Sequence, residues 1–219
     1  MRRTGAGAAG RTARPAAGLA AGLAAGLAAL LLAGCSSGEA GVPGLREAAG
    51  EAFVSGDSTV QVLPVAERGE PVEGLVGSTL EGEELDVADL RGGLVVLNVW
   101  GSWCGPCHGE APDLVAAEQR LTGPDGPGAD VAFVGLNIRD RSVEAAAGFE
   151  EEYGIGWPSL YDPDSALLLR LAGEIPTNVV PATLVLDQEG RVAARLLSQV
   201  NEATLVGVVE DVVAGGDGA

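Results

Sequence analysis

The sequence predicts an α/β fold built on a central mixed β-sheet with helices on both of its faces. Two apolar runs, residues 94–99 (LVVLNV) and 131–137 (VAFVGLN), have the length of buried strands. Each run is followed by a segment with helical spacing of apolar residues, which is typical of parallel βαβ units. Near the C-terminus, the strand-like runs 182–186 and 192–197 are joined by residues 187–190 (DQEG), a hairpin signal that adds antiparallel strands to the sheet.

Helical segments connect the strands in the central part of the chain. Residues 112–121 have apolar side chains at helical spacing, and the turn-rich residues 123–130 (GPDGPGAD) end that helix. Pro112 within such a helix would kink it, unless the regular helix begins only there. Ser142 is of the residue type that caps helix N-termini, and it predicts a helix that continues to about Tyr153.

Shorter elements complete the predicted fold. Pro158 opens a short strand, and residues 166–171 are expected to form a brief helix. Asn201 caps a last helix whose apolar residues fall on one face. Residues 59–63 (TVQVL) alternate like an edge strand, and the acids within residues 81–89 are expected in a solvated hairpin and helix start.

The N-terminus resembles a bacterial lipoprotein signal. Four arginines and no acid precede the uncharged, apolar residues 16–34, and Cys35 follows at once. The segment Leu32-Ala33-Gly34-Cys35 resembles the lipobox, in which that cysteine is acylated and becomes the new N-terminus. An uncleaved membrane anchor is the alternative, because about 20 apolar residues span a bilayer.

The domain organisation follows from this signal. We expect a lipoprotein signal peptide at residues 1–34, a flexible tether rich in Gly, Ala, Pro and acids at residues 35–70, and one folded domain at residues 71–215. The folded domain would then lie outside the cytoplasm, anchored to the outer face of the cell membrane through its lipid only.

Composition limits the chemistry that the chain can perform. Its formal net charge is −18, and without the first four arginines the remaining 9 Arg against 31 acids give −22. Such a surface repels phosphate backbones and anionic lipids, which excludes nucleic acid as a partner. The chain has three Cys and one His. A structural zinc site made of these side chains would need all four, so we expect neither a metal nor another cofactor.

One motif indicates redox chemistry. Cys104-Gly-Pro-Cys107 follows a predicted buried strand and begins a predicted helix, the redox arrangement of a thioredoxin-like fold. At a helix N-terminus the helix dipole and the free backbone N–H groups stabilise a thiolate, so the pKa of the Cys104 thiol should fall. Cys104 would therefore attack a partner disulfide, and Cys107, one turn further into the helix, would resolve the mixed disulfide.

Residues 71 to about 213 resemble the TlpA/ResA-like thiol-disulfide oxidoreductases of the thioredoxin superfamily. The resemblance rests on VVLNVWGSWCGPC at residues 95–107, on Glu110-Ala111-Pro112, and on Val180-Pro181-Ala182-Thr183 before a strand. It implies a thioredoxin-like fold and a cis bond between Val180 and Pro181. It also implies that an extended substrate segment binds at these two residues beside Cys104, with Trp103 shielding one side of the site.

The residue that moves protons differs from thioredoxin. Where thioredoxin has a buried Asp before the motif, this chain has Asn98, which cannot take up or release a proton. In the ResA-like branch a Glu three residues after the second Cys is held to be that group, and Glu110 matches it. The alternative is that Glu110 merely stabilises the helix dipole from the first turns of the helix.

Two other interpretations of the cysteines remain open at this point. The pair could be a structural disulfide, although so short a bridge constrains little chain entropy. Residues 104–108 also spell C-x-x-C-H, the attachment signature of c-type haem, but the usual distal Met or second His is missing. His108 is then expected to face solvent in the first helical turn, with a role in tuning the thiols as the alternative. Trp100 is expected in the core.

We therefore expect a monomeric, membrane-tethered oxidoreductase that reduces protein disulfides, for example the apocytochrome c thiols during cytochrome c maturation, as the resemblance implies. A reductant in an oxidising compartment must be recharged, which implies a membrane thiol donor of the CcdA/DsbD type. The alternatives are a thiol oxidase or isomerase for secreted proteins, a peroxiredoxin-like peroxidase, and a non-catalytic binding lipoprotein.

Overall fold

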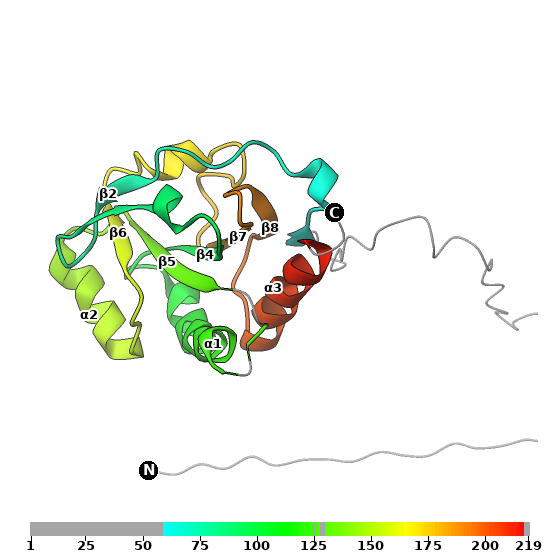
Figure 1. Ribbon diagram of the computed structural model, residues 1–219. Helices are drawn as coiled ribbons and strands as arrows, with labels where there is room; N and C mark the ends of the chain where they lie inside the picture. Colours follow the sequence, from blue (N-terminus) through cyan, green and yellow to red (C-terminus); the bar gives the residue numbers. More distant parts are fainter. Residues whose placement is uncertain (1–58, 125, 128–129, 217–219) are drawn as a thin grey trace, which may run out of the picture. The chain divides into compact units, whose positions relative to one another are not determined.

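A computed structural model describes residues 59–124, 126, 127 and 130–216. The expected signal peptide, Cys35 with its expected acylation, and the first part of the expected tether lie outside these residues. The described chain forms a six-stranded sheet in the order β1-β8-β7-β4-β5-β6 (Figure 1). The strands are β1 (Val60–Val62), β8 (Val192–Leu196), β7 (Ala182–Leu186), β4 (Leu94–Trp100), β5 (Val131–Ile138) and β6 (Ser159–Asp162).

The sheet is mixed, as the sequence predicts. Strands β4, β5 and β6 are parallel, whereas β7 pairs antiparallel with β4, β8 with β7 and β1 with β8. The hairpin between β7 and β8 lies where the DQEG turn predicts it. Parallel strands need crossover helices, and the chain supplies them after β4 and after β5.

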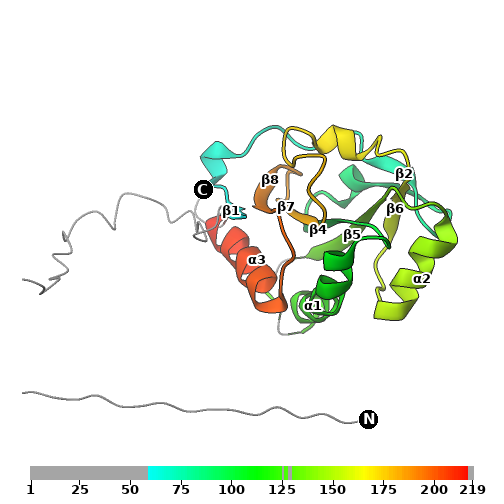
Figure 2. The same cartoon turned by 180° about the vertical axis from the view of Figure 1, so that it is seen from behind.

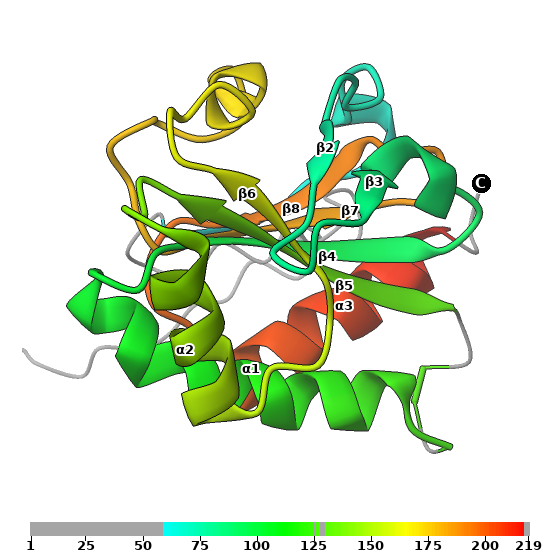
Figure 3. The ribbon, with the colours of Figure 1, turned by 90° about the vertical axis from the view of Figure 1, so that its left-hand side faces the viewer.

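The α-helices of the described residues lie on one side of the sheet, and short elements lie on the other (Figure 3). The helices are α1 (Gly105–Thr122), α2 (Val143–Tyr153) and α3 (Glu202–Gly216). The opposite side carries the hairpin of β2 (Val76–Ser78) and β3 (Glu84–Asp86) with the 3-10 helices η2 (Val87–Leu90) and η3 (Leu168–Leu171). Both faces are therefore covered by helical segments, as expected, but the α-helices share one face.

The residues of β4 explain this two-sided core. All seven are buried, and their side chains alternate between the two faces. Leu94 and Val96 pack in one cluster with α1 and with Leu205 of α3, whereas Val95 and Leu97 pack in a second cluster with η3. A strand buried on both faces stabilises the fold from either side, at about 1.5–3 kcal/mol for each large apolar side chain.

The helix starts predicted by the two capping residues and by the cysteine motif are confirmed. The Ser142 hydroxyl accepts a hydrogen bond from the Ala145 N–H at 3.3 Å, and Asn201 Oδ1 accepts one from the Thr204 N–H at 2.9 Å. Helix α1 begins at Gly105, directly after Cys104 as the motif predicts, so Pro112 lies inside the helix and the alternative that the helix starts there is wrong.

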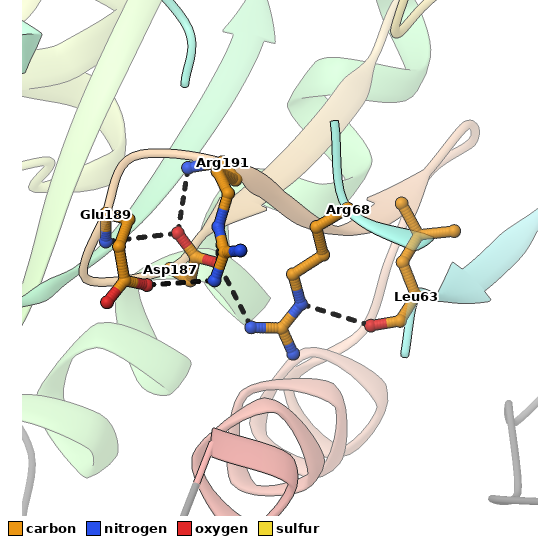
Figure 4. A network of polar contacts seen from close by, with 5 residues as sticks. All are labelled: Leu63, Arg68, Asp187, Glu189 and Arg191. Carbon is orange, nitrogen blue, oxygen red and sulfur yellow. Dashed lines mark hydrogen bonds and ion pairs between the residues drawn. The ribbon is translucent and has the colours of Figure 1, made fainter. Parts of the chain in front are cut away.

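The sheet begins before residue 71, where we expected the folded domain to start. Strand β1, predicted as an edge strand, pairs with β8 within the expected tether (Figure 2). A buried ion pair fixes the chain that follows it: the Arg68 guanidinium lies 3.1 Å from Asp187 at the end of β7 and also donates to the Leu63 carbonyl at 3.2 Å (Figure 4). Arg191 contacts the same carboxylate at 2.9 Å. The segment that the sequence placed in the tether is thus part of the sheet structure.

Candidate active site

The two cysteines lie at the junction of β4 and α1. Strand β4 ends at Trp100, and Cys104 is the N-cap of α1, where its sulfur accepts a hydrogen bond from the Cys107 N–H at 3.3 Å. Cys104 and Cys107 form a disulfide, with their Cα atoms 5.2 Å apart, and their exposed fractions are 4% and 1%. A sulfur at this position can become a thiolate that the helix N-terminus stabilises.

Trp103 lies on the surface beside the cysteine. Its indole Nε1 donates to the Ile138 carbonyl at 3.1 Å, and half of the side chain (51%) is exposed. The ring passes over Gly101, where a Cβ atom would come within 2.5 Å of the indole nitrogen. Gly101 is therefore needed for the ring to lie in this position next to Cys104.

Asp140 fixes the loop before Cys104, a contact that sequence analysis missed. Its buried carboxylate accepts hydrogen bonds from the Ser102 N–H at 2.9 Å, from the Ser102 hydroxyl at 2.5 Å and from Asn137 Nδ2 at 2.6 Å. Asp140 follows β5, the parallel neighbour of β4. The carboxyl ends of parallel neighbouring strands meet at one sheet edge, so a polar residue just after β5 was the available signal.

His108 is only partly exposed, and both of its ring nitrogens contact the protein, contrary to our expectation of a solvent-facing residue. One ring nitrogen, Nδ1, lies 2.9 Å from the Tyr153 hydroxyl of α2, and the other, Nε2, lies 2.9 Å from the Ser102 carbonyl oxygen. The ring also packs edge-on against Phe149, with centroids 4.8 Å apart. Helix α2 covers the first turn of α1, which sequence periodicity within one helix does not reveal. Trp100 is in the core, as expected, and stacks on Phe149.

Glu110 lies inside the protein behind the cysteines. Only 1% of it is exposed, and its carboxylate accepts hydrogen bonds from Asn98 Nδ2 at 2.9 Å and from the Val200 N–H at 3.2 Å. Burial raises the pKa of Glu110 to about 7, although the hydrogen bond from Asn98 lowers it. Cys107 and Glu110 are three residues apart on α1, so they share one face of the helix. The carboxyl group can therefore exchange a proton at neutral pH.

The residues that precede β7 also lie near the cysteines. Strand β7 pairs with β4 on the edge opposite to β5. The bond between Val180 and Pro181 is cis, as expected from the resemblance. Val180 is half-buried and packs against the cluster that contains Trp100, Cys104 and Cys107. The structure thus brings the two cysteines and Val180 together in one cluster.

Other kinds of site have little support among the described residues. Within residues 59–124, 126, 127 and 130–216, no group of three or more His, Cys, Asp or Glu side chains is arranged to hold a metal ion. Across the same part of the chain, no helix is long and apolar enough to cross a bilayer.

One protein-family model covers the six-stranded sheet and both cysteines. The Redoxin family model matches residues 57–211. The thiol-disulfide oxidoreductase ResA of Bacillus anthracis is 24% identical over 144 residues, which are 66% of this chain and 78% of ResA. The structure of a DsbF homologue from Corynebacterium diphtheriae is 36% identical, with a TM-score of 0.63, over 73% of this chain and 98% of that one. A secreted thiol-disulfide isomerase from Corynebacterium glutamicum is 31% identical, with a TM-score of 0.64, over 75% and 98%.

Proposed function

Because the chain belongs to the Redoxin family and is a TlpA/ResA-like thiol-disulfide oxidoreductase of the thioredoxin fold, we propose that it reduces disulfides of extracytoplasmic proteins while tethered to the membrane. The observation that carries this proposal is the position of the cysteine pair at the start of α1, with the buried carboxyl group of Glu110 on the same helical face.

The reaction transfers two electrons from the cysteine pair to the substrate. In the reduced protein, the Cys104 thiolate attacks one sulfur of the substrate disulfide, and the other substrate sulfur leaves with the bonding electrons. The Cys107 thiol then gives its proton to the carboxylate of Glu110 and attacks Cys104. The Cys104–Cys107 disulfide forms and the bond from Cys104 to the substrate breaks. Both substrate sulfurs thus leave as thiolates, which take one proton from Glu110 and one from water to give the dithiol.

The substrate binds between Trp103 and the cis-proline. Val180 and Pro181 precede β7, and Val180 packs against the cluster that contains Cys104. An extended peptide can bind there by main-chain hydrogen bonding, as in other cases of strand addition. The half-exposed indole of Trp103 borders the same cysteine and supplies apolar contact surface.

The compartment and the electron donor follow from the N-terminus and from the chemistry. The lipobox-like segment ending at Cys35 supports a lipid anchor on the outer face of the cell membrane, and the similar isomerase from Corynebacterium glutamicum is a secreted protein. In an oxidising compartment the disulfide must be reduced after each turnover, which requires a membrane thiol donor of the CcdA/DsbD type. Apocytochrome c thiols are the substrate class that the resemblance to TlpA/ResA-like enzymes favours.

A second candidate function is disulfide isomerisation in secreted proteins. It is favoured by the 31% identity to the secreted thiol-disulfide isomerase from Corynebacterium glutamicum. Both functions use the same two cysteines, and they differ in the reduction potential that the pair needs.

Trapping of mixed disulfides tests the assigned roles. A Cys107→Ser variant should attack substrates through Cys104 but leave the mixed disulfide unresolved, so covalent complexes should accumulate. Non-reducing gels and mass spectrometry of full-length protein from its native membranes would detect and identify the trapped proteins. The matched control is Cys104→Ser, which should trap none. If Cys104→Ser traps partners and Cys107→Ser does not, the two roles are reversed.

A further inference from the structure

Asn98 contacts the carboxylate of Glu110 from the middle of β4. The strand register places Asn98 opposite Thr183 of β7. Its side-chain nitrogen Nδ2 lies 2.9 Å from Glu110 Oε1 and 3.1 Å from Thr183 Oγ1. All three residues are buried, with exposed fractions of 4%, 1% and 0%. This polar cluster therefore connects α1, β4 and β7 in the interior.

The two contacts use both hydrogens of the amide nitrogen. A side-chain amide has two N–H donors on one end and a carbonyl acceptor on the other. A rotated amide would direct its carbonyl oxygen at the carboxylate of Glu110, and two acceptors repel each other. The ionised carboxylate and the Thr183 hydroxyl thus fix the amide in one orientation, and the fixed amide in turn holds the carboxylate.

An acid could not replace this amide without changing the chemistry of Glu110. An aspartate at position 98 would place a second carboxyl group within hydrogen-bonding distance of the first. Two carboxylates that close do not both ionise near neutral pH, and their proton affinities become coupled. The amide instead donates a hydrogen bond, which favours the ionised form that can accept a proton.

We propose that Asn98 is the positioning residue of this enzyme: it holds the Glu110 carboxylate on the Cys107 side of α1 and, through Thr183, ties it to the strand that follows the cis-proline. This inference rests on the proposed role of Glu110 as the proton acceptor for Cys107. It adds that an amide on β4 lowers the pH at which resolution becomes fast, together with the Val200 N–H and against the effects of burial and of Asp113. This amide is anchored two residues from Pro181, where the substrate binds.

The test measures how the resolution rate depends on pH. Oxidised protein is reduced, and Cys104 is loaded with thionitrobenzoate from Ellman's reagent. Attack by Cys107 then releases the coloured thiol, which stopped-flow absorbance follows between pH 5 and 9. In the wild type the rate should rise through the pKa of Glu110, and Glu110→Gln should remove that inflection.

Asn98→Ala should move the inflection upward by about one pH unit, because a hydrogen bond to a charged group is lost, and one unit equals a tenfold change. At pH 7 resolution should then be about fivefold slower, because the ionised fraction of Glu110 falls from about one half to about one tenth. Thr183→Val is the comparison variant, since it removes one anchor of the amide but leaves the bond from Asn98 to Glu110, so its inflection should move less than that of Asn98→Ala.

The outcomes separate this inference from the function on which it rests. If Glu110→Gln keeps the wild-type inflection, the proposed role of Glu110 is wrong. If Glu110→Gln removes the inflection but Asn98→Ala does not shift it, or shifts it no more than Thr183→Val does, Asn98 is not the positioning residue. If circular dichroism shows that Asn98→Ala does not fold, the pH dependence of the resolution rate is measured with Asn98→Asp instead. Two inflections, or one inflection above the wild-type pH, would support the inference. A single inflection at the wild-type pH would overturn it.

Discussion

The buried carboxyl group of Glu110 should make the stability of the protein depend on pH. Burial raises its pKa from 4.5 to about 7, so between these pH values the folded state binds a proton that the unfolded state has lost. The stability that this group contributes is therefore fully present below about pH 4.5 and is lost as the pH rises through about 7. Glu110→Gln removes the titrating group and with it this loss.

The magnitude follows from the size of the shift. A rise from 4.5 to about 7 corresponds to about 3 kcal/mol, at about 1.4 kcal/mol for each pKa unit. The Glu110→Gln substitution also lowers the free energy of unfolding by a constant amount. Both Asn98 Nδ2 and the Val200 N–H donate to the carboxylate, and the NH₂ group of the glutamine must face one of these donors. That cost is independent of pH, so it moves the whole stability curve without changing its slope.

Urea unfolding of the oxidised wild type and of Glu110→Gln at pH values from 4.5 to 8.5 would measure both effects. The free energy of unfolding of the wild type minus that of the variant should fall by about 3 kcal/mol across this range. Glu150, whose pKa burial also raises to about 7, contributes equally to both proteins and cancels. Glu151→Gln, on the exposed surface of α2, should give a curve parallel to the wild type. If the Glu110→Gln curve is also parallel to it, the carboxyl group does not titrate as its burial implies, and the reasoning is refuted.

Two further predictions concern the fold and the direction of electron flow. Asp187→Asn should lower the free energy of unfolding by about 3–5 kcal/mol, because it leaves the buried Arg68 guanidinium without its counter-charge. Urea unfolding would measure this change, with Glu189→Gln at the exposed rim of the same network as the control. A decrease of less than about 1 kcal/mol for Asp187→Asn would contradict the importance of this ion pair. The reduction potential of the Cys104–Cys107 pair, measured by equilibration with glutathione, should lie near the value of about −270 mV known for thioredoxin if the protein is a reductase. A potential near the value of about −180 mV of protein disulfide isomerase would instead support the second candidate function.

The sequence predicted the parts of the fold and the site that depend on local patterns. Apolar runs identified β4 and β5, a turn signal identified the hairpin of β7 and β8, and the motif from Cys104 to Cys107 indicated its own place at a helix start. Contacts between distant residues could not be found this way. Asp140 is 38 residues from Ser102, and Thr183 is 85 residues from Asn98. Thr183 meets Asn98 through the register of β7 against β4, which a single sequence does not specify. For Asp140, its position just after β5 was the one available signal.

The start of the expected domain and the surroundings of His108 have the same explanation. The hydrophobic pattern of residues 59–63 indicated a strand, but its place in the sheet depends on pairing with β8 and on the ion pair of Arg68 with Asp187. The sequence predicted a solvent-facing His108 because the pattern within its own helix does not reveal which other helix packs against it. Its neighbours come from α2, whose packing against α1 is a tertiary feature.

The sulfur of Cys104 both carries electrons and caps a helix. It accepts the Cys107 N–H in the disulfide form, and a thiolate at the same position is a stronger acceptor because it is charged. Reduction therefore tightens the first turn of α1, and oxidation loosens it. By thermodynamic linkage, any substitution that frays this turn removes part of the stabilisation of the thiolate and makes the cysteine pair a stronger electron donor. The first turn of α1 therefore contributes to the reduction potential of the cysteine pair.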